Sequence, residues 1–369
     1  MNDDYSTQSH KKYTQLLRKL QKELPDFCAE FFRGIDSRTT ALTRYAYATD
    51  FNLFFTYLIN EHEKFKDRKS TRDFSVRDLD LVSPTDIEMY LDYLSLYTRV
   101  INGSEIATMN KERAKARKLA SLRSLYKYFY KKEKIFTNPP AMVDIPKIHE
   151  QPIIRLDPNE IVDILNICEK LEGLTPHQKK YNENTRIRDI AIITLFLGTG
   201  IRISELVGID IDDINFISNE FAVIRKGGKR DVLVFGPEVR EALLEYLLLR
   251  ERMVAKEGHE NALFLSLQMK RITVRAVENI VKKFARAAVP QKHITPHKLR
   301  STFGTMLYAE TGDIYLVADV LGHKDVNTTR KHYADISRER RRVAAEVVRL
   351  REDSKPEPKT KNKDSDSVS

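Results

Sequence analysis

The chain has 369 residues, of which 41% are apolar and 31% are charged. This length exceeds a typical single core of roughly 100–200 residues and favours two domains, and the composition excludes a fully disordered chain. The formal net charge of +10 favours a polyanionic partner, because Lys and Arg gain affinity for phosphates by releasing counterions. A solvated basic surface without such a partner would give the same net charge.

No apolar run approaches the roughly 18 residues that span a membrane, and the first residues, MNDDYSTQSHKK, lack the apolar stretch of a secretory signal. We therefore expect a cytoplasmic protein. The two cysteines, Cys28 and Cys168, lie far apart and form no C-x-x-C pair, which indicates neither a disulfide framework nor a zinc site. Both are expected to be reduced residues of the core.

Residues 1–23 are polar and basic, and they predict a lead-in helix or arm. Residues 24–145 predict a helical domain of four or five helices, because apolar and aromatic residues follow at helical spacing through residue 138. Ser83 followed by Pro84 marks the start of one of these helices.

Basic and aromatic residues alternate between positions 111 and 134, where ten Lys or Arg stand against two Glu. A helix with one basic and one aromatic side can pack on its own domain while the basic side meets DNA phosphates. An amphipathic helix with a merely solvated basic side is the alternative. The ten basic residues are Lys111, Arg113, Lys115, Arg117, Lys118, Arg123, Lys127, Lys131, Lys132 and Lys134.

Prolines interrupt the helical pattern after Asn138, and we place a linker at residues 146–152 and a second domain at residues 153–351. Helices are predicted at residues 158–171 and 186–197, and again from Pro237. The four prolines are Pro139, Pro140, Pro146 and Pro152.

Residues 221–226 and 229–235 predict a strand pair joined by Gly227-Gly228 as a tight hairpin, so the fold class is mainly α with a small β-sheet. This hairpin places Lys226 just before its turn, where a long side chain can swing into a neighbouring groove. Taken alone, such a lysine is more often solvated or bound to the DNA backbone than catalytic.

Arg202 and Glu205 follow a Gly-containing turn at the start of a predicted helix, spaced i, i+3. Glu205 can hold the Arg202 guanidinium in one orientation, although a plain surface ion pair would have the same spacing. The glycines of this turn match neither G-x-G-x-x-G after a strand nor G-x-x-x-x-G-K-S/T, so no nucleotide cofactor is indicated.

His297 and Arg300 are expected in the first turn of a helix that Thr295 caps and Pro296 begins. Free backbone N–H groups and the helix dipole make such a turn a site for one phosphate, which Arg300 can grip through two oxygens. A metal site at His293 and His297 is not indicated, because Pro296 interrupts the helix that would align them and no third ligand accompanies them.

Downstream, Asp313 is predicted to cap a short helix over residues 314–321 that ends at Gly322 and presents His323. Tyr333 follows ten residues later. Tyrosine is a poor nucleophile at neutral pH because its pKa is near 10, so attack on phosphorus requires cations near the developing phenolate. Alone, Tyr333 would more often be a core or interface residue.

Beyond Tyr333, residues 336–350 predict an amphipathic helix that packs on its own domain or docks on another protomer. Residues 352–369 are rich in Lys, Asp, Ser and Pro and predict a disordered tail.

Five motifs in this order, T-G-x-R-x-x-E-L, K-G-G-K, H-x-L-R, L-G-H and the tyrosine ten residues after that His, resemble those of the tyrosine recombinases. The resemblance covers residues 153–349 and, more weakly, residues 24–145. Within the family the chain is most similar to the Xer recombinases of bacteria and to related integrases of mobile elements.

The resemblance implies that four residues surround the scissile phosphate: Arg202, His297, Arg300 and His323. Tyr333 would be the nucleophile that forms a 3′-phosphotyrosyl link, Lys226 would protonate the leaving 5′-oxygen, and Glu205 would support Arg202. His297 is the expected general base, although the sequence does not decide which histidine deprotonates Tyr333. Neither a metal nor a nucleotide cofactor is expected, since the phosphotyrosine conserves the energy of the bond.

The resemblance also implies a helical core-binding domain and a catalytic domain that form a C-shaped clamp on duplex DNA. Four protomers would act on two sites through a Holliday junction, and the C-terminal helix would pass between subunits. The expected role is Xer-type chromosome dimer resolution in chromosome partition and cell division, with a septal DNA translocase as a further partner.

Three alternatives remain at this point. An integrase or excisionase of a mobile element would carry the same motifs, and the sequence does not separate it from the Xer role. A type IB topoisomerase shares the phosphotyrosine chemistry, but the motif spacings and the preceding helical domain resemble recombinases better. A DNA-binding protein without catalysis would have no use for Tyr333 together with two arginines and two histidines.

Overall fold

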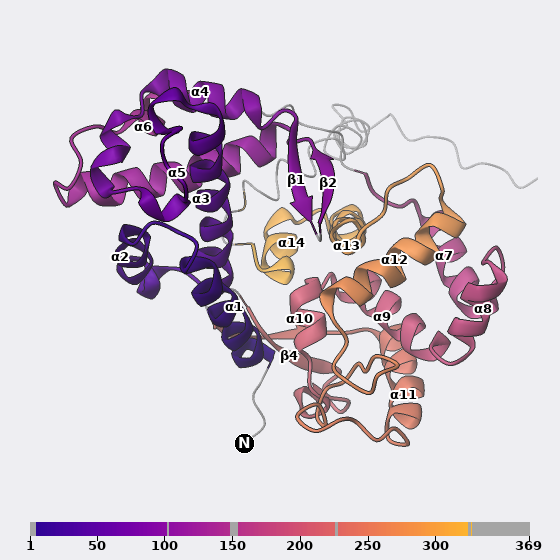
Figure 1. Ribbon diagram of the computed structural model, residues 1–369. Coiled ribbons are helices and arrows are strands. Elements are labelled where there is room, and N and C mark those ends of the chain that lie inside the picture. The colour runs from indigo at the N-terminus through magenta and orange to yellow at the C-terminus, as the bar shows by residue number, and fades with distance from the viewer. Residues whose placement is uncertain (1–4, 102, 148–153, 226–227, 324–325, 327–369) are drawn as a thin grey trace, which may run out of the picture. The chain divides into compact units, whose positions relative to one another are not determined.

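The computed structural model describes residues 5–101, 103–147, 154–225, 228–323 and 326 (Figure 1). The chain divides into two compact units, Met1–Pro152 and Ile153–Ser369, and each is described by itself. Both are mainly helical with one small antiparallel sheet each, which confirms the predicted fold class. No helix in the described part of the chain is long and apolar enough to cross a membrane.

The first unit contains six α-helices and a β-hairpin in its described part. Helix α1 packs on α3 and places Leu17 in the core, so the basic lead-in is a helix of this unit. Short 3₁₀ turns connect α3 to α4. In chain order the elements are α1 (Tyr5–Gln21), α2 (Phe27–Gly34), α3 (Ala41–Glu61), α4 (Pro84–Tyr93), β1 (Tyr97–Ile101), β2 (Ser104–Thr108), α5 (Glu112–Lys131) and α6 (Pro139–Met142).

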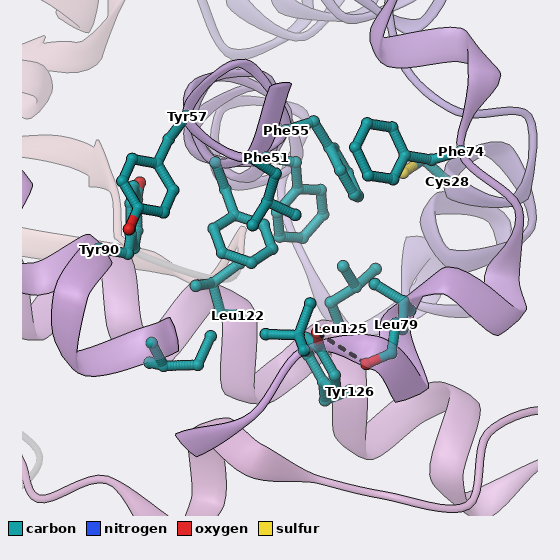
Figure 2. Packing of buried hydrophobic residues seen from close by; sticks show 14 of the residues in the cluster. Cys28, Phe51, Phe55, Tyr57, Phe74, Leu79, Tyr90, Leu122, Leu125 and Tyr126 are labelled. Carbon is teal, nitrogen blue, oxygen red and sulfur yellow. Dashed lines mark hydrogen bonds between the residues drawn. The ribbon is translucent and has the colours of Figure 1, made fainter. Parts of the chain in front are cut away.

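Aromatic rings fill the core of the first unit (Figure 2). Phe51 and Phe55 from α3 lie near Leu122 and Leu125 from α5, and all four are fully buried. The Tyr126 hydroxyl donates a hydrogen bond to the Leu79 carbonyl at 3.3 Å, which satisfies a polar group that the core would otherwise bury at a cost. The aromatic side of the predicted basic helix is therefore a core face.

The β1–β2 hairpin corrects the expectation that residues 24–138 are helical throughout. Its register pairs Tyr97 with Thr108 and Ile101 with Ser104. Asn-Gly at positions 102–103 is a strong hairpin signal, and Gly103 has the positive φ of 78° that such turns require. The β-branched residues on either side favour strands, and tertiary packing of Tyr97 holds the hairpin on the unit.

The second unit contains eight α-helices and three strands in its described part. Helix α9 is its centre: it packs against α7, α11 and α13 and buries Ile192, Leu195 and Phe196. The helices are α7 (Pro158–Lys170), α8 (Pro176–Glu183), α9 (Arg186–Thr199), α10 (Ile203–Gly208), α11 (Pro237–Arg250), α12 (Val274–Ala288), α13 (Pro296–Thr311) and α14 (Ile314–Leu321).

The sheet of the second unit has the order β3 (Ile214–Asn215), β4 (Glu220–Ile224) and β5 (Arg230–Val234), all antiparallel. The predicted two-residue Gly-Gly turn is wrong. Ile224 pairs with Arg230, and the Arg225 N–H donates to the Lys229 carbonyl at 2.7 Å, so Arg225 rather than Lys226 lies opposite Lys229. Gly228 supplies the positive φ, which is the pattern of a three-residue hairpin loop.

Other sequence expectations agree with the structure more closely. The helices expected at residues 158–171 and 186–197 and from Pro237 correspond to α7, α9 and α11. The chain after Asn138 forms the four-residue helix α6, so the helical pattern breaks later than the first two prolines suggest. Both cysteines are buried and free as expected, and burial raises the pKa of each thiol.

Each unit buries one carboxylate between two cations. Asp50 on α3 is 1% exposed and accepts from Arg117 at 2.5 and 2.7 Å and from Lys118 at 2.9 Å. In the second unit, Asp189 is fully buried and contacts Arg188 at 2.7 Å and Lys283 at 3.1 Å. These pairs join α3 to α5 and α9 to α12, because a buried charge is tolerated only beside its partner.

We predict that Asp50→Ala lowers the free energy of unfolding by about 3–5 kcal/mol, because it leaves the buried Lys118 ammonium without its carboxylate. Asp26→Ala is the control, since Asp26 and Arg72 form an exposed pair worth about 0–1 kcal/mol. Urea denaturation of the full chain measures both. Equal losses for the two variants would contradict the structural role of the buried pair.

Candidate active site

Four of the predicted site residues, Arg202, Glu205, Arg300 and His323, lie around the carbonyl end of α14. Asp313 caps the other end of this helix, accepting from the backbone N–H groups of Tyr315 and Leu316. Gly322 ends the helix in the left-handed conformation with φ 60°, and His323 follows it. A helix end leaves carbonyl groups without intrahelical donors, and here arginine side chains supply them.

Arg202 reaches this helix end from the start of α10. Its Nη2 donates to the carbonyls of Leu321 at 3.2 Å and Gly322 at 2.9 Å. Its Nη1 donates to Glu205 Oε1 at 2.7 Å, and the other Glu205 oxygen accepts from the Arg202 backbone N–H at 2.9 Å. The buried Glu205 thus fixes both the backbone and the guanidinium of Arg202, as the i, i+3 spacing predicted.

Arg300 approaches from the first turn of α13, where the sequence placed it. Its Nη1 donates to the Gly200 carbonyl at 2.6 Å, and its Nη2 donates to the Leu321 carbonyl. Arg300 as a whole residue is 5% exposed, whereas the side chain of Arg202 is 33% exposed. Arg300 therefore ties the turn before Arg202 to the end of α14 from the interior of the unit.

A third guanidinium, that of Arg225 at the end of β4, meets the same carbonyl. Its Nη1 donates to Leu321 at 2.9 Å and its Nη2 to Val320 at 3.3 Å, while its Nε donates to Asp231 at 2.8 Å. Gly322 permits this approach, because a Cβ at that position would lie 2.0 Å from the Arg225 Nη1 atom. We call Arg202, Arg225 and Arg300 the arginine cluster.

The two histidines lie beside this arrangement. His297 is exposed in the first turn of α13, on the same helix as Arg300, and its carbonyl accepts from the Ser301 hydroxyl at 3.0 Å. His323 is partly exposed and directly follows Gly322, whose carbonyl Arg202 binds. The structure thus brings Arg202, Glu205, Arg300 and the segment carrying His323 together. Lys226 and Tyr333 lie outside the described residues.

Three guanidinium groups and the N-terminus of α13 concentrate positive charge around a helix end in one unit. Backbone carbonyls bind all three groups. Arg202 also binds Glu205 and Arg225 also binds Asp231, so these two carboxylates offset only part of the positive charge. Such a pre-positioned cluster suits a phosphate whose negative charge grows during a reaction.

Sequence reasoning missed Arg225. Two signals could have found it: its place directly before the K-G-G-K motif, and Asp231, which lies across the hairpin from it. Neither signal by itself predicts that Arg225 binds the end of α14, because Leu321 lies 96 residues away in the chain.

Comparison with known proteins identifies the family of the chain. The family model described as the phage integrase family matches residues 154–340. The chain is 36% identical over 305 residues to "Tyrosine recombinase XerC" of Caldanaerobacter subterraneus subsp. tengcongensis, covering 81% of this chain and 79% of the relative. It is 29% identical over 343 residues to "Tyrosine recombinase XerS" of Lactococcus lactis subsp. lactis, covering 85% and 93%.

Among solved structures, the pre-cleavage complex of the XerH site-specific recombinase bound to difH has a TM-score of 0.59 and 18% identity. The match covers 94% of this chain and 97% of that one, and it shows a shared fold. The matching family model and the XerC relative define the class of the chain as a DNA strand-exchange enzyme.

The chain belongs to the phage integrase family of tyrosine recombinases. It is a site-specific recombinase, an enzyme that binds duplex DNA and cleaves and rejoins its strands.

We predict that Gly322→Ala destabilises the second unit more than Gly258→Ala. Both glycines have positive φ, which costs other residues about 1–2 kcal/mol, but a Cβ at Gly258 meets open space. At Gly322 it displaces the Arg225 guanidinium and adds about 1.5–3 kcal/mol for lost charged hydrogen bonds. Urea denaturation measures the difference, and equal losses would contradict a cluster that needs this close approach.

Proposed function

We propose that Arg202 and Arg300 of the arginine cluster hold the scissile phosphate and that Tyr333 attacks it. The observation that carries this proposal is the meeting of Arg202 and Arg300 at the end of α14, directly before His323. Arg202 and Arg300 bind the non-bridging oxygens. His323 donates a hydrogen bond to one of these oxygens, and Glu205 keeps Arg202 in place.

In the cleavage step, the Tyr333 oxygen forms a bond to phosphorus and the bond from phosphorus to the 5′-oxygen breaks. His297 takes the phenolic proton as general base, and the leaving 5′-oxygen takes a proton from Lys226 as general acid. The product is a 3′-phosphotyrosyl link and a free 5′-hydroxyl. Rejoining reverses these steps with a new strand, so the energy of the phosphodiester is kept and no nucleotide or metal cofactor is required.

We further propose an Xer-type role, the resolution of chromosome dimers in the cytoplasm by a homotetramer acting on two DNA sites through a Holliday junction. Matches to XerC and XerS relatives over most of their length support it. Residues 336–350, outside the described residues, would dock on the next protomer, and a septal DNA translocase would activate the complex. A gene located among mobile-element genes would favour an integrase instead.

Helix α5 is the proposed DNA-binding surface of the first unit. Several of its basic residues bind protein groups instead: Lys118 and Arg117 contact Asp50, and Arg123 donates to carbonyls at the end of α6. Three exposed residues, Arg113, Lys127 and Lys131, recur at helical spacing on the side opposite the buried Leu122 and Phe129. This exposed stripe is the part suited to phosphates.

We predict that the double change Lys127→Ala and Lys131→Ala weakens binding to all duplex sequences. It should reduce the slope of log K against log salt by about 0.9 per lost phosphate contact. Lys132→Ala with Lys134→Ala is the matched control, because Glu30 already pairs with both lysines, at 3.1 and 2.6 Å. Titrations at several salt concentrations measure the slopes, and equal slopes for the two double variants would favour a merely solvated surface.

We predict that Tyr333→Phe abolishes the covalent adduct on a nicked suicide substrate while folding and DNA binding persist. Phe keeps the ring and removes only the attacking oxygen. The unaltered protein should form the adduct in the presence of a chelator, because cationic side chains rather than a metal stabilise the transition state. An adduct with the Phe variant would refute the role of Tyr333, and loss of the adduct on chelation would refute metal-free catalysis.

A further inference from the structure

Arg225 is the one member of the arginine cluster to which the proposed mechanism gives no role. Its side chain is 8% exposed, and its three nitrogens donate to Asp231, Leu321 and Val320. All three nitrogens of this guanidinium thus have acceptors within the protein. These contacts indicate that Arg225 positions other parts of the protein.

The backbone of Arg225 forms the base of the β4–β5 loop. Its N–H donates to the Lys229 carbonyl at 2.7 Å, and its own carbonyl accepts from the Gly228 N–H at 3.0 Å. Lys226 is the next residue, so its Cα lies about 3.8 Å from that of Arg225. Backbone hydrogen bonds thus hold Arg225, the residue directly before Lys226 in the chain.

The side chain of Arg225 ties this loop base to the phosphate-binding residues. It shares the Leu321 carbonyl with Arg202 and Arg300, and it touches the turn at Gly322 that presents His323. Asp231 on β5 holds the same guanidinium, so both strands of the hairpin are attached to the end of α14. A loop anchored only by its own strand pairing would move freely relative to that helix.

We propose that Arg225 is a positioning residue that sets Lys226 against the leaving 5′-oxygen, a proposal that rests on the general-acid role of Lys226. A misplacement of about 1 Å between a catalytic group and its target can cost on the order of 100-fold in rate. Loss of the anchor should therefore slow proton donation, with DNA binding unchanged.

The experiment compares cleavage of two nicked suicide substrates that differ in one atom, the bridging 5′-oxygen or sulfur at the scissile phosphate. A thiolate leaves without being protonated, because a thiol has a pKa near 8.5, far below that of an alcohol. A defect in general-acid catalysis is therefore rescued by sulfur, whereas a defect in phosphate binding or folding is not.

Arg225→Met keeps an unbranched side chain about as long as the aliphatic part of arginine and removes its donors. We expect cleavage of the oxygen substrate to fall roughly 10- to 100-fold and cleavage of the sulfur substrate to stay within several-fold of the unaltered protein. Arg225→Lys keeps the charge, should show a smaller defect with the same rescue, and carries the test if the Met variant does not fold. Equal defects on both substrates would overturn the proposal.

Two controls separate the possible failures. Lys226→Ala must be rescued by sulfur; if it is not, the general-acid role of Lys226 has failed rather than the role of Arg225. Arg230→Met removes an exposed arginine from the same hairpin, whose contact with Asp213 is 3.8 Å. Any defect that it causes should be the same on both substrates, so rescue of this variant would show that sulfur rescue is not specific to the anchor.

Discussion

The carbonyl group of Leu321 is the acceptor on which the second unit organises its site. Three guanidinium groups from three distant segments bind it: Arg202 at the start of α10, Arg225 at the end of β4 and Arg300 in α13. Like charges repel at such short range. The three guanidinium groups nevertheless gather here because each finds carbonyl acceptors for its N–H groups in place of water. The helix end offers those partners, since its last carbonyls have no intrahelical donors.

Both units use the same means to hold their helices in register around apolar cores. Asp50 joins α3 to α5, and Asp189 joins α9 to α12, each by placing one buried carboxylate between two cations. Burial lowers the pKa of Lys283, while the nearby Asp189 acts in the opposite direction. Apolar packing supplies most of the stability of such a core, and buried charges restrict which helix faces can meet.

Local chemistry determined how much the sequence could predict. Pro296, Asp313 and Gly322 act within a turn of their own positions, so the start of α13 and both ends of α14 follow from the residues there. Thr295 takes the predicted N-cap position of α13 without a side-chain cap hydrogen bond. The Arg202–Glu205 contact is also local. The cluster around Leu321 depends instead on segments about 100 residues apart, and the three-residue loop after Arg225 depends on a register that Gly-Gly alone does not determine. The β1–β2 hairpin was not predicted, although Asn-Gly at positions 102–103 is a strong hairpin signal.

The arginines bind backbone carbonyls of α14, so these contacts do not depend on which side chains the helix carries. Every residue type provides a carbonyl group, so mutation of the side chains on α14 removes no acceptor. Tyr315, which is 71% exposed, and Leu316, which is 40% exposed, can be replaced by other residues that are compatible with a helix. Gly322 cannot be replaced in this way, because its missing side chain is the space that Arg225 occupies. Substitution should therefore be tolerated at the exposed positions of α14 and not at Gly322, which directly follows the helix.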